Sequence, residues 1–205
     1  MKPPKDFNKK RIHASNIEDY LKKKYNVKEV KQTSNKLLKF SPLLQNNYGG
    51  DGDCTLTSIT ACTNYYLKNA KSIQEIYDYV EKVAKKWGYR GDKGTMPIFI
   101  QAIYNSVLKK FPCKRKSTSF GYYKNIGFNF NAIKRIIDKS MPLVLSMNND
   151  GRNYYTNHSI TIVGYRTYKI NNKQTAHMLI IYDNWYESIS FIDYDVLPMI
   201  AVINY

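Results

Sequence analysis

The hydrophobic pattern of this chain changes its period once, and that change most restricts the folds open to it. Up to about residue 140, apolar residues recur at helical spacing in separate blocks, most clearly over residues 73 to 87. From His158 onward, the pattern has a period of two, as in β-strands. Helices first and antiparallel strands second predict an α+β domain with two segregated layers.

Several predicted helices have recognisable ends. Ser15 with Glu18, and Ser72 with Glu75, form capping boxes, and Gly88 ends the second of these helices. Thr95 is expected to cap a further helix that has Pro97 in its first turn. Other helices are expected over residues 55 to 67 and 131 to 140. Strands are expected over residues 143 to 147, 158 to 165, 178 to 182, 190 to 192 and 199 to 203, and residues 26 to 36 are expected to be a polar connection.

Length and composition favour one globular unit. The 205 residues, 43% of them apolar, fit one folded domain over residues 41 to 205 behind a basic extension, residues 1 to 40. No run of about 18 apolar residues predicts a membrane span. The first residues show no signal peptide pattern, so a cytoplasmic protein and a secreted mature form both stay open. Three cysteines predict no disulfide framework.

The charge is large and uneven. The formal net charge is +16, with 12 basic against 4 acidic residues over positions 1 to 40 and 9 against 1 over positions 101 to 140. Such segments attract polyanions by counterion release. The basic residues 1 to 40 and 109 to 139 are therefore a candidate polyanion contact, although a solvated lysine-rich surface explains the same composition.

Cys54 follows a glycine-rich loop and directly precedes the helix expected from residue 55. Unpaired N–H groups and the positive end of the helix dipole lower the pKa of a thiol at such a position. We therefore expect a thiolate nucleophile, with burial as a small apolar residue as the alternative. Cys62, on the inner face of the same helix, and Cys113, in a basic loop, are expected to be structural.

Two later segments could complete a nucleophilic site. His158 opens the first strand of the period-two region, and Asp183, Asn184 and Trp185 close a later one. In a Cys–His site, the imidazole takes and returns the proton while a carboxylate or amide holds its other nitrogen. His177, which precedes a strand, is a weaker rival as the base.

Three sequence segments together resemble papain-like cysteine peptidases. They are Gln45 ahead of Gly52-Asp53-Cys54, the strand that starts at His158, and the run Ile181-Tyr182-Asp183-Asn184-Trp185. The chain resembles in particular the bacterial branch that includes bacteriocin-leader peptidases and staphopains. The likeness spans about residues 42 to 195, and residues 1 to 40 have no counterpart in it.

The resemblance implies roles for single residues. Cys54 would be the nucleophile and His158 the general base and acid. The spacing to Trp185, the expected lid of the cleft, favours Asp183 as the third member, with Asn184 as the alternate.

The resemblance also implies an oxyanion hole built from the Cys54 N–H and a glutamine side chain. The family often places this glutamine six residues before the cysteine, where this chain has Tyr48. Gln45 is therefore the expected donor and Asn47 the alternate. Thr55, where relatives often carry Gly or Trp, is a second departure from the family's sequence pattern.

The expected function is a thiol hydrolase, in the first place a peptidase that forms an acyl-enzyme. Transglutaminases, amidases and acyltransferases use the same chemistry. No pattern for a metal or other cofactor is present. The alternative is a catalytically idle papain-like domain that binds a polyanion or a protein partner. Residues 1 to 40 would be a propeptide remnant over the cleft or a packed extra helix, and a substrate pocket is expected near residues 91 to 95 and 153 to 156.

Overall fold

The computed structural model describes residues 2–45, 47–50, 52–111, 116–117, 119–120, 129–148, 155, 157–197 and 201–205. Cys113, much of the basic segment 109 to 139 and most of residues 153 to 156 lie outside the described residues. The described helices and strands are, in chain order, α1 (Phe7–Lys10), α2 (Ile17–Tyr25), β1 (Lys31–Leu37), α3 (Cys54–Leu67), α4 (Ile73–Lys86), η1 (Gly91–Lys93), η2 (Pro97–Phe99), α5 (Ile100–Lys110), β2 (Ser119–Phe120), α6 (Phe130–Asp138), β3 (Leu143–Met147), β4 (His158–Lys169), β5 (Thr175–Tyr182), β6 (Ser190–Asp193), η3 (Tyr194–Val196) and β7 (Ala201–Asn204).

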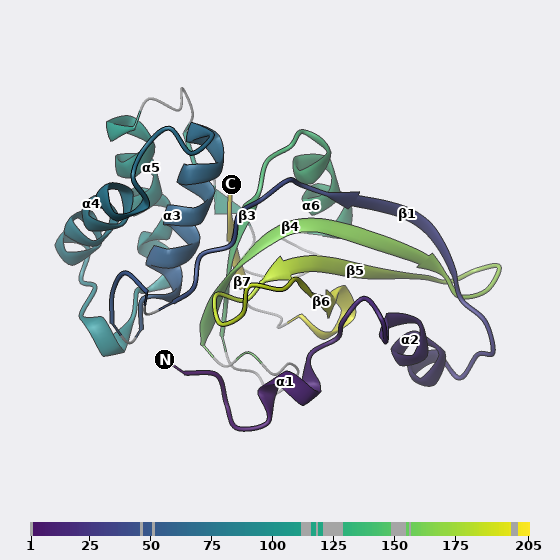
Figure 1. Ribbon diagram of the computed structural model, residues 1–205. Coiled ribbons are helices and arrows are strands. Elements are labelled where there is room, and N and C mark those ends of the chain that lie inside the picture. Colours follow the sequence, from purple (N-terminus) through teal and green to yellow (C-terminus); the bar gives the residue numbers. More distant parts are fainter. Residues whose placement is uncertain are drawn as a thin grey trace.

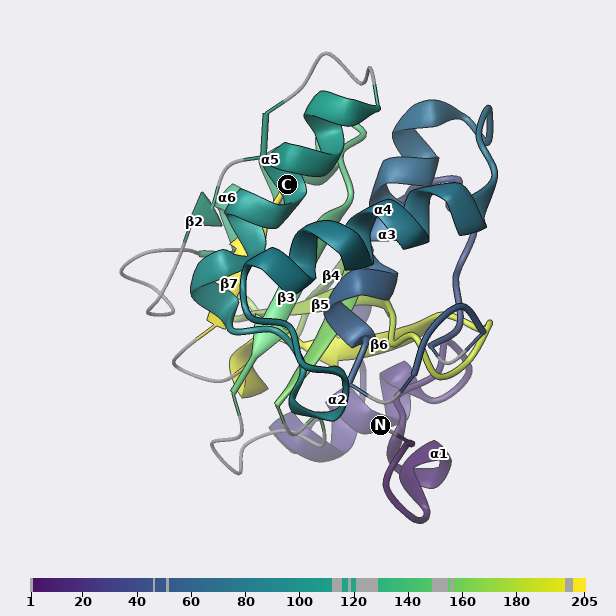
Figure 2. The same cartoon turned by 90° about the vertical axis from the view of Figure 1, so that its left-hand side faces the viewer.

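The strands form one antiparallel sheet in the order β2-β7-β3-β4-β5-β6, with β1 also paired to β4. The long strand β4 is its centre, because β3 and β1 pair with it on one side and β5 on the other. Helices α3, α4 and α5 lie together beside the sheet (Figure 1). Figure 2 shows the same helices from their own side, in front of the strands. The two segregated layers predicted from the sequence are confirmed.

The period-two pattern explains why both faces of the sheet are covered. On β5, Met178 and Ile180 belong to the core shared with the helical layer, whereas Leu179 and Ile181 belong to the core on the opposite face. Successive side chains of a strand point to opposite faces, so the apolar residues of β5 contribute alternately to the two cores. The second core is closed by α6 and by Phe7.

The helix starts differ from the predicted caps in detail. Asn16, rather than Ser15, is the N-cap of α2, and Ser72 is the N-cap of α4 without a side-chain cap hydrogen bond. Pro97 opens the short 3-10 helix η2, and α5 begins only at Ile100, so Thr95 does not cap it. These predictions failed because hydroxyl caps depend on a local geometry that spacing alone does not determine.

The amino-terminal segment contributes to the sheet itself. Residues predicted as a polar connection form β1, which pairs with β4 from Lys31 opposite Lys169 to Leu37 opposite Gly164. Helix α2 buries Ile17 and Leu21 in the main core. The prediction of a connection was wrong because β1 has polar, largely exposed side chains and is held by its backbone. Within the described residues, none of the helices has the length and apolar character needed to cross a membrane.

Candidate active site

Cys54 is the first residue of α3 and is placed by the tight loop before it. Gly52 has a φ of 80°, and a Cβ there would lie 2.1 Å from the carbonyl oxygen of Gly91. Only glycine fits this left-handed, closely packed position. Asp53, fully buried, is the N-cap residue, and its carboxylate accepts a hydrogen bond of 3.0 Å from the Tyr77 hydroxyl. The packing of Gly52 against Gly91 and the hydrogen bond between Tyr77 and Asp53 therefore fix the loop, and with it the position at which α3 begins.

An open cleft of about 620 Å³ lies at this helix start. Its lining comes from both layers: the Cys54 loop, the segment from Asp92 to Pro97, the end of β3 and the start of β4. The first of the two segments expected to build a substrate pocket, residues 91 to 95, thus lines the cleft. Among the described residues, the lining includes none from positions 1 to 40. The described part of the amino-terminal segment, residues 2 to 40, therefore does not line this cleft.

His158 is the first residue of β4 and is almost completely buried, at 1% exposure. Its Nε2 lies 2.8 Å from the main-chain carbonyl oxygen of Asp183. Because a carbonyl oxygen only accepts hydrogen bonds, Nε2 carries the proton and Nδ1 of the neutral ring does not. Nδ1 is buried without a hydrogen-bond partner among the described residues. The ring thus keeps one unprotonated nitrogen, to which no described group, the Cys54 thiol included, is hydrogen-bonded.

Aromatic rings hold the imidazole in place. Trp185 stacks on His158 with ring centroids 4.0 Å apart and 15° between the planes, and Tyr155 lies parallel to it at 5.9 Å. Burial lowers the pKa of His158 to about 4, although the carbonyl and charge of Asp183 raise it. His158 is therefore neutral at pH 7. Trp185, expected as a lid of the cleft, packs on the ring of His158.

Asp183 reaches the base through its main chain. Its carboxylate oxygen Oδ1 accepts hydrogen bonds from the N–H groups of Trp185 and Tyr186, both at 3.1 Å. Its Oδ2 lies 3.0 Å from Nε of Arg11 in an ion pair whose side chains are 0% and 1% exposed. The sequence favoured this side chain as the holder of the imidazole, but its carboxylate binds the following turn and Arg11. The reason is that β5 ends at Tyr182, so Asp183 adopts a turn that its own side chain closes.

Asn184, the alternate third member, does not hold the imidazole either. Its Nδ2 lies 3.1 Å from the Cys54 carbonyl oxygen, 2.8 Å from Ser58 Oγ and 2.9 Å from the Ser159 carbonyl oxygen. Its own carbonyl oxygen accepts the main-chain N–H of Gln45 at 2.6 Å. This single residue thus joins the helix that begins at Cys54, the strand that begins at His158 and the segment that carries Gln45.

The candidate oxyanion donors differ sharply in burial. Gln45 is 5% exposed, and both its Nε2 and Oε1 are buried without a hydrogen-bond partner among the described residues. An unpaired buried amide costs roughly 1–3 kcal/mol. Asn47 is exposed, and Tyr48 packs against Tyr77 with ring centroids 5.9 Å apart. Of these candidates, Gln45 is the buried one, and it is not among the described residues that line the cleft.

Burial of Cys54 opposes the thiolate expected there. Burial raises the pKa of Cys54 above its ordinary value, and the charge of Asp53 adds to this, although the N–H groups of Ser159 and Thr55 lower it. Desolvation at this buried site opposes the helix dipole, so the surroundings of Cys54 and His158 favour the neutral thiol and the neutral imidazole. The expected thiolate stays a prediction.

The remaining candidates lie elsewhere. Cys62 is fully buried in the core between the layers, and burial raises its pKa to about 12. His177 stacks on Phe130 of α6 with centroids 4.0 Å apart. Contacts missed in the sequence are Arg11 on Asp183 and the 2.7 Å hydrogen bond between the Thr55 and Ser159 hydroxyls. A lone arginine in a basic arm carries no sequence signal for either burial or pairing.

A cysteine at a helix start and a histidine at the start of a central strand, in two facing layers, form the papain-like α+β arrangement. The model of the Peptidase_C39-like family matches residues 16 to 196, and the chain belongs to this family of cysteine peptidases. The match starts well before residue 42, so part of the amino-terminal segment does have a counterpart.

Among solved structures, the chain resembles one described as a C39-like peptidase from Bacillus anthracis. The two are 14% identical with a TM-score of 0.48, over 84% of this chain and 98% of the other. No curated protein sequence matches the chain.

Proposed function

We propose that the protein cleaves peptide bonds through an acyl-enzyme, with Cys54 as nucleophile and His158 as general base and acid. The observation that carries this proposal is the state of His158. Its Nε2 is committed to the Asp183 carbonyl oxygen, and its unprotonated Nδ1 has no partner among the described residues. A ring held in this tautomer is prepared to accept a proton.

The reaction would begin from the neutral pair. As the substrate carbonyl arrives, the Cys54 thiol passes its proton to Nδ1 of His158, and the sulfur attacks the carbonyl carbon. The negative oxygen of the tetrahedral intermediate accepts hydrogen bonds from the Cys54 N–H and from Nε2 of Gln45. His158 then protonates the leaving amine, and water releases the acyl group in the reverse sequence. The partnerless amide of Gln45 supports its part in this scheme.

The third member in this proposal is the main-chain carbonyl of Asp183. It holds the tautomer and orientation of His158, as the side chain of an Asp or Asn does in other nucleophilic sites. Membership of a cysteine peptidase family favours peptide bonds over the bonds used by transglutaminases, amidases or acyltransferases. The finer likeness to bacteriocin-leader peptidases and staphopains remains part of the proposal.

The test compares Cys54→Ala with Cys62→Ala, a matched control on the same helix but in the core. Purified variants are assayed with a fluorogenic peptide library, and thiol labelling by iodoacetamide is located by peptide mapping. We expect Cys54→Ala and His158→Ala to lose turnover, and Cys62→Ala to retain it. Equal turnover of wild type and Cys54→Ala would remove the proposal.

A further inference from the structure

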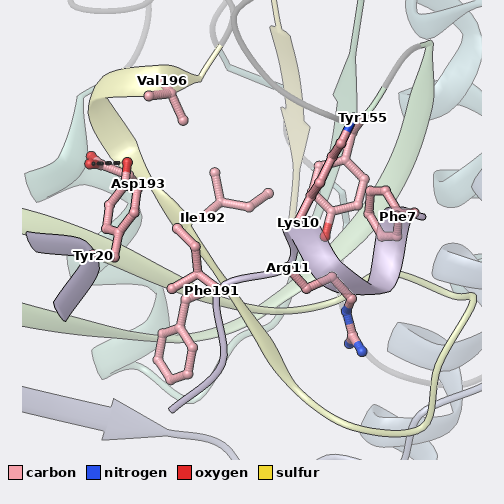
Figure 3. A pocket seen from close by; sticks show the side chains of 10 residues that line it. Phe7, Lys10, Arg11, Tyr20, Tyr155, Phe191, Ile192, Asp193 and Val196 are labelled. Carbon is pink, nitrogen blue, oxygen red and sulfur yellow. Dashed lines mark hydrogen bonds between the residues drawn. The ribbon is translucent and has the colours of Figure 1, made fainter. Parts of the chain in front are cut away.

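The segment formed by residues 7 to 12 packs behind the catalytic base rather than over the cleft. The Phe7 ring, 2% exposed, meets Trp185 edge-on at 4.9 Å and Tyr155 at 5.0 Å. These are the two rings that stack on His158. Figure 3 shows Phe7 beside Tyr155; both rings line a small cavity of about 70 Å³, as Arg11 does. The segment is fixed to β6 by the 2.8 Å hydrogen bond from the Phe191 N–H to the Ile12 carbonyl oxygen.

Arg11 binds the turn after β5 at several points. Besides its ion pair with Asp183, its Nη2 donates to the Ser188 carbonyl oxygen at 2.8 Å, and Nη1 donates to Ser188 Oγ at 3.2 Å. Its guanidinium also lies over the Tyr186 ring, 4.4 Å from the centroid. One planar group therefore holds both ends of the turn from residue 183 to residue 188. A flexible ammonium could not make this set of contacts.

The clamp on this turn determines which part of Asp183 faces the base. With Oδ2 on Arg11 and Oδ1 on the amides of Trp185 and Tyr186, both carboxylate oxygens are engaged. The carbonyl oxygen of the same residue is left to accept from Nε2 of His158. Without Arg11, a buried carboxylate would lie close to the imidazole with no counter-ion. The carboxylate of Asp183 would then compete with the main-chain carbonyl of the same residue for the hydrogen bond from Nε2 of His158.

We propose that Arg11 is a positioning residue for His158, acting through the 183 to 188 turn, and that Phe7 supports it through Trp185. The proposal rests on the proposed function for its effect on turnover. Both residues precede position 16, where the match to the family begins. The amino-terminal segment is thus part of the catalytic scaffold of this chain, although it contributes no residue to the lining of the cleft among those described.

The first experiment observes the ring directly. The chain has three histidines, so ¹⁵N-edited NMR of the ring nitrogens at pH 7 resolves few signals, and His158→Gln assigns the one of interest. We expect wild type to show His158 as the Nε2–H tautomer. Arg11→Met is expected to shift or broaden this signal toward mixed tautomers or a charged ring. Lys9→Met is the matched control, because Lys9 is 83% exposed and carries the same charge on the same segment.

The second experiment measures turnover of folded protein. We expect Arg11→Met to lower kcat about 10- to 100-fold with little change in KM, Arg11→Lys to recover part of this loss, and Lys9→Met to match wild type. The kcat of Phe7→Leu, which keeps an apolar side chain, should lie between those of Arg11→Met and wild type. If Arg11→Met folds and leaves both the His158 signal and kcat unchanged, the residue is only structural and the proposal is wrong.

The two proposals fail in distinguishable ways. Loss of the Nε2–H tautomer in Arg11→Met, in a protein with no peptidase activity even as wild type, contradicts the proposed function and supports the positioning role. Should Arg11→Met not fold, Arg11→Lys and Phe7→Leu carry the same comparison. Wild-type tautomer and kcat in both would overturn the proposal.

Discussion

Gln45 and His158 are among several buried side chains that present polar atoms without a hydrogen-bond partner among the described residues. Arg11 Nε and Asp183 Oδ2, which form an ion pair, are others. Folded proteins rarely leave such groups unpaired, because each costs free energy. Gln45 and His158 are both residues that the sequence singled out for chemistry. Their cost is explained if a bound substrate supplies the missing partners.

Replacing Gln45 with alanine should remove one oxyanion donor. We expect kcat to fall about 100- to 1,000-fold with a smaller change in KM, since the donor acts on charge that develops in the transition state. Asn47→Ala, at the exposed alternate position, should keep at least half of the wild-type kcat. Steady-state kinetics on one peptide substrate decide between them. The reverse ranking would assign the oxyanion hole to Asn47.

The buried His158 should make the fold sensitive to mild acid. Its pKa in the folded state is lowered to about 4, below the ordinary value of 6.5, so between these values the unfolded chain binds a proton that the folded chain does not. Its contribution to stability is full above about pH 6.5 and is lost as the pH falls through about 4. Urea unfolding of wild type should lose up to about 1.4 kcal/mol per pH unit from this group.

His158→Gln supplies the control for this pH dependence. Burial also lowers the pKa of His177, so both proteins should keep a common slope from that residue. We expect the slope between pH 6.5 and 4 to be smaller in His158→Gln. Identical slopes would show that His158 titrates normally.

At the scale of elements, the short turn after β5 organises the site. Asn184 has a φ of 64°, in the left-handed region. Its side-chain amide donates to α3 and β4, and its main-chain carbonyl oxygen accepts the N–H of Gln45. Asparagine tolerates this conformation better than most residues. The turn therefore fixes the position of the Cys54 helix relative to the strand that begins at His158.

Asn184→Gly keeps this backbone conformation and removes only the amide. We expect the free energy of unfolding to fall by about 1–3 kcal/mol, because the acceptors on Cys54 and Ser159 lose a buried donor. Asn26→Gly, at another left-handed position with a φ of 53°, should change stability by less than about 0.5 kcal/mol. Urea denaturation measures both. Equal effects would mean that the Asn184 contacts contribute little.

At the scale of the whole molecule, residues 1 to 40 are bound into the domain. Strand β1 pairs with β4, Arg11 is buried on Asp183, and Lys24 Nζ lies 2.6 Å from Asp193 Oδ2. Arg11 and Lys24 therefore stabilise the fold through ion pairs within the domain. The charge on the remaining surface still allows contact with a polyanion, which stays a prediction.

Gly164 permits the close approach of β1. A Cβ at this residue would lie 2.2 Å from the carbonyl oxygen of Lys36. Gly164→Ala should therefore push β1 away from β4 and lower the free energy of unfolding by about 1–3 kcal/mol. Gly50→Ala is the control, since a Cβ there has no atom within 4 Å. Unchanged urea unfolding of Gly164→Ala would show that β1 is only loosely attached.

The sequence by itself determined the two layers and the positions of Cys54 and His158 at element starts. Hydrophobic period and residue spacing are local properties, and they suffice for these features. Only the tertiary structure decided the burial of the Cys54 thiol, the direction of the Asp183 carboxylate and the burial of Arg11. Each of these depends on what surrounds a group in three dimensions. Desolvation raises the pKa of Cys54, and the Asp183 carboxylate pairs with Arg11, 172 positions away in the sequence, instead of with His158. Local spacing carries no information about such partners.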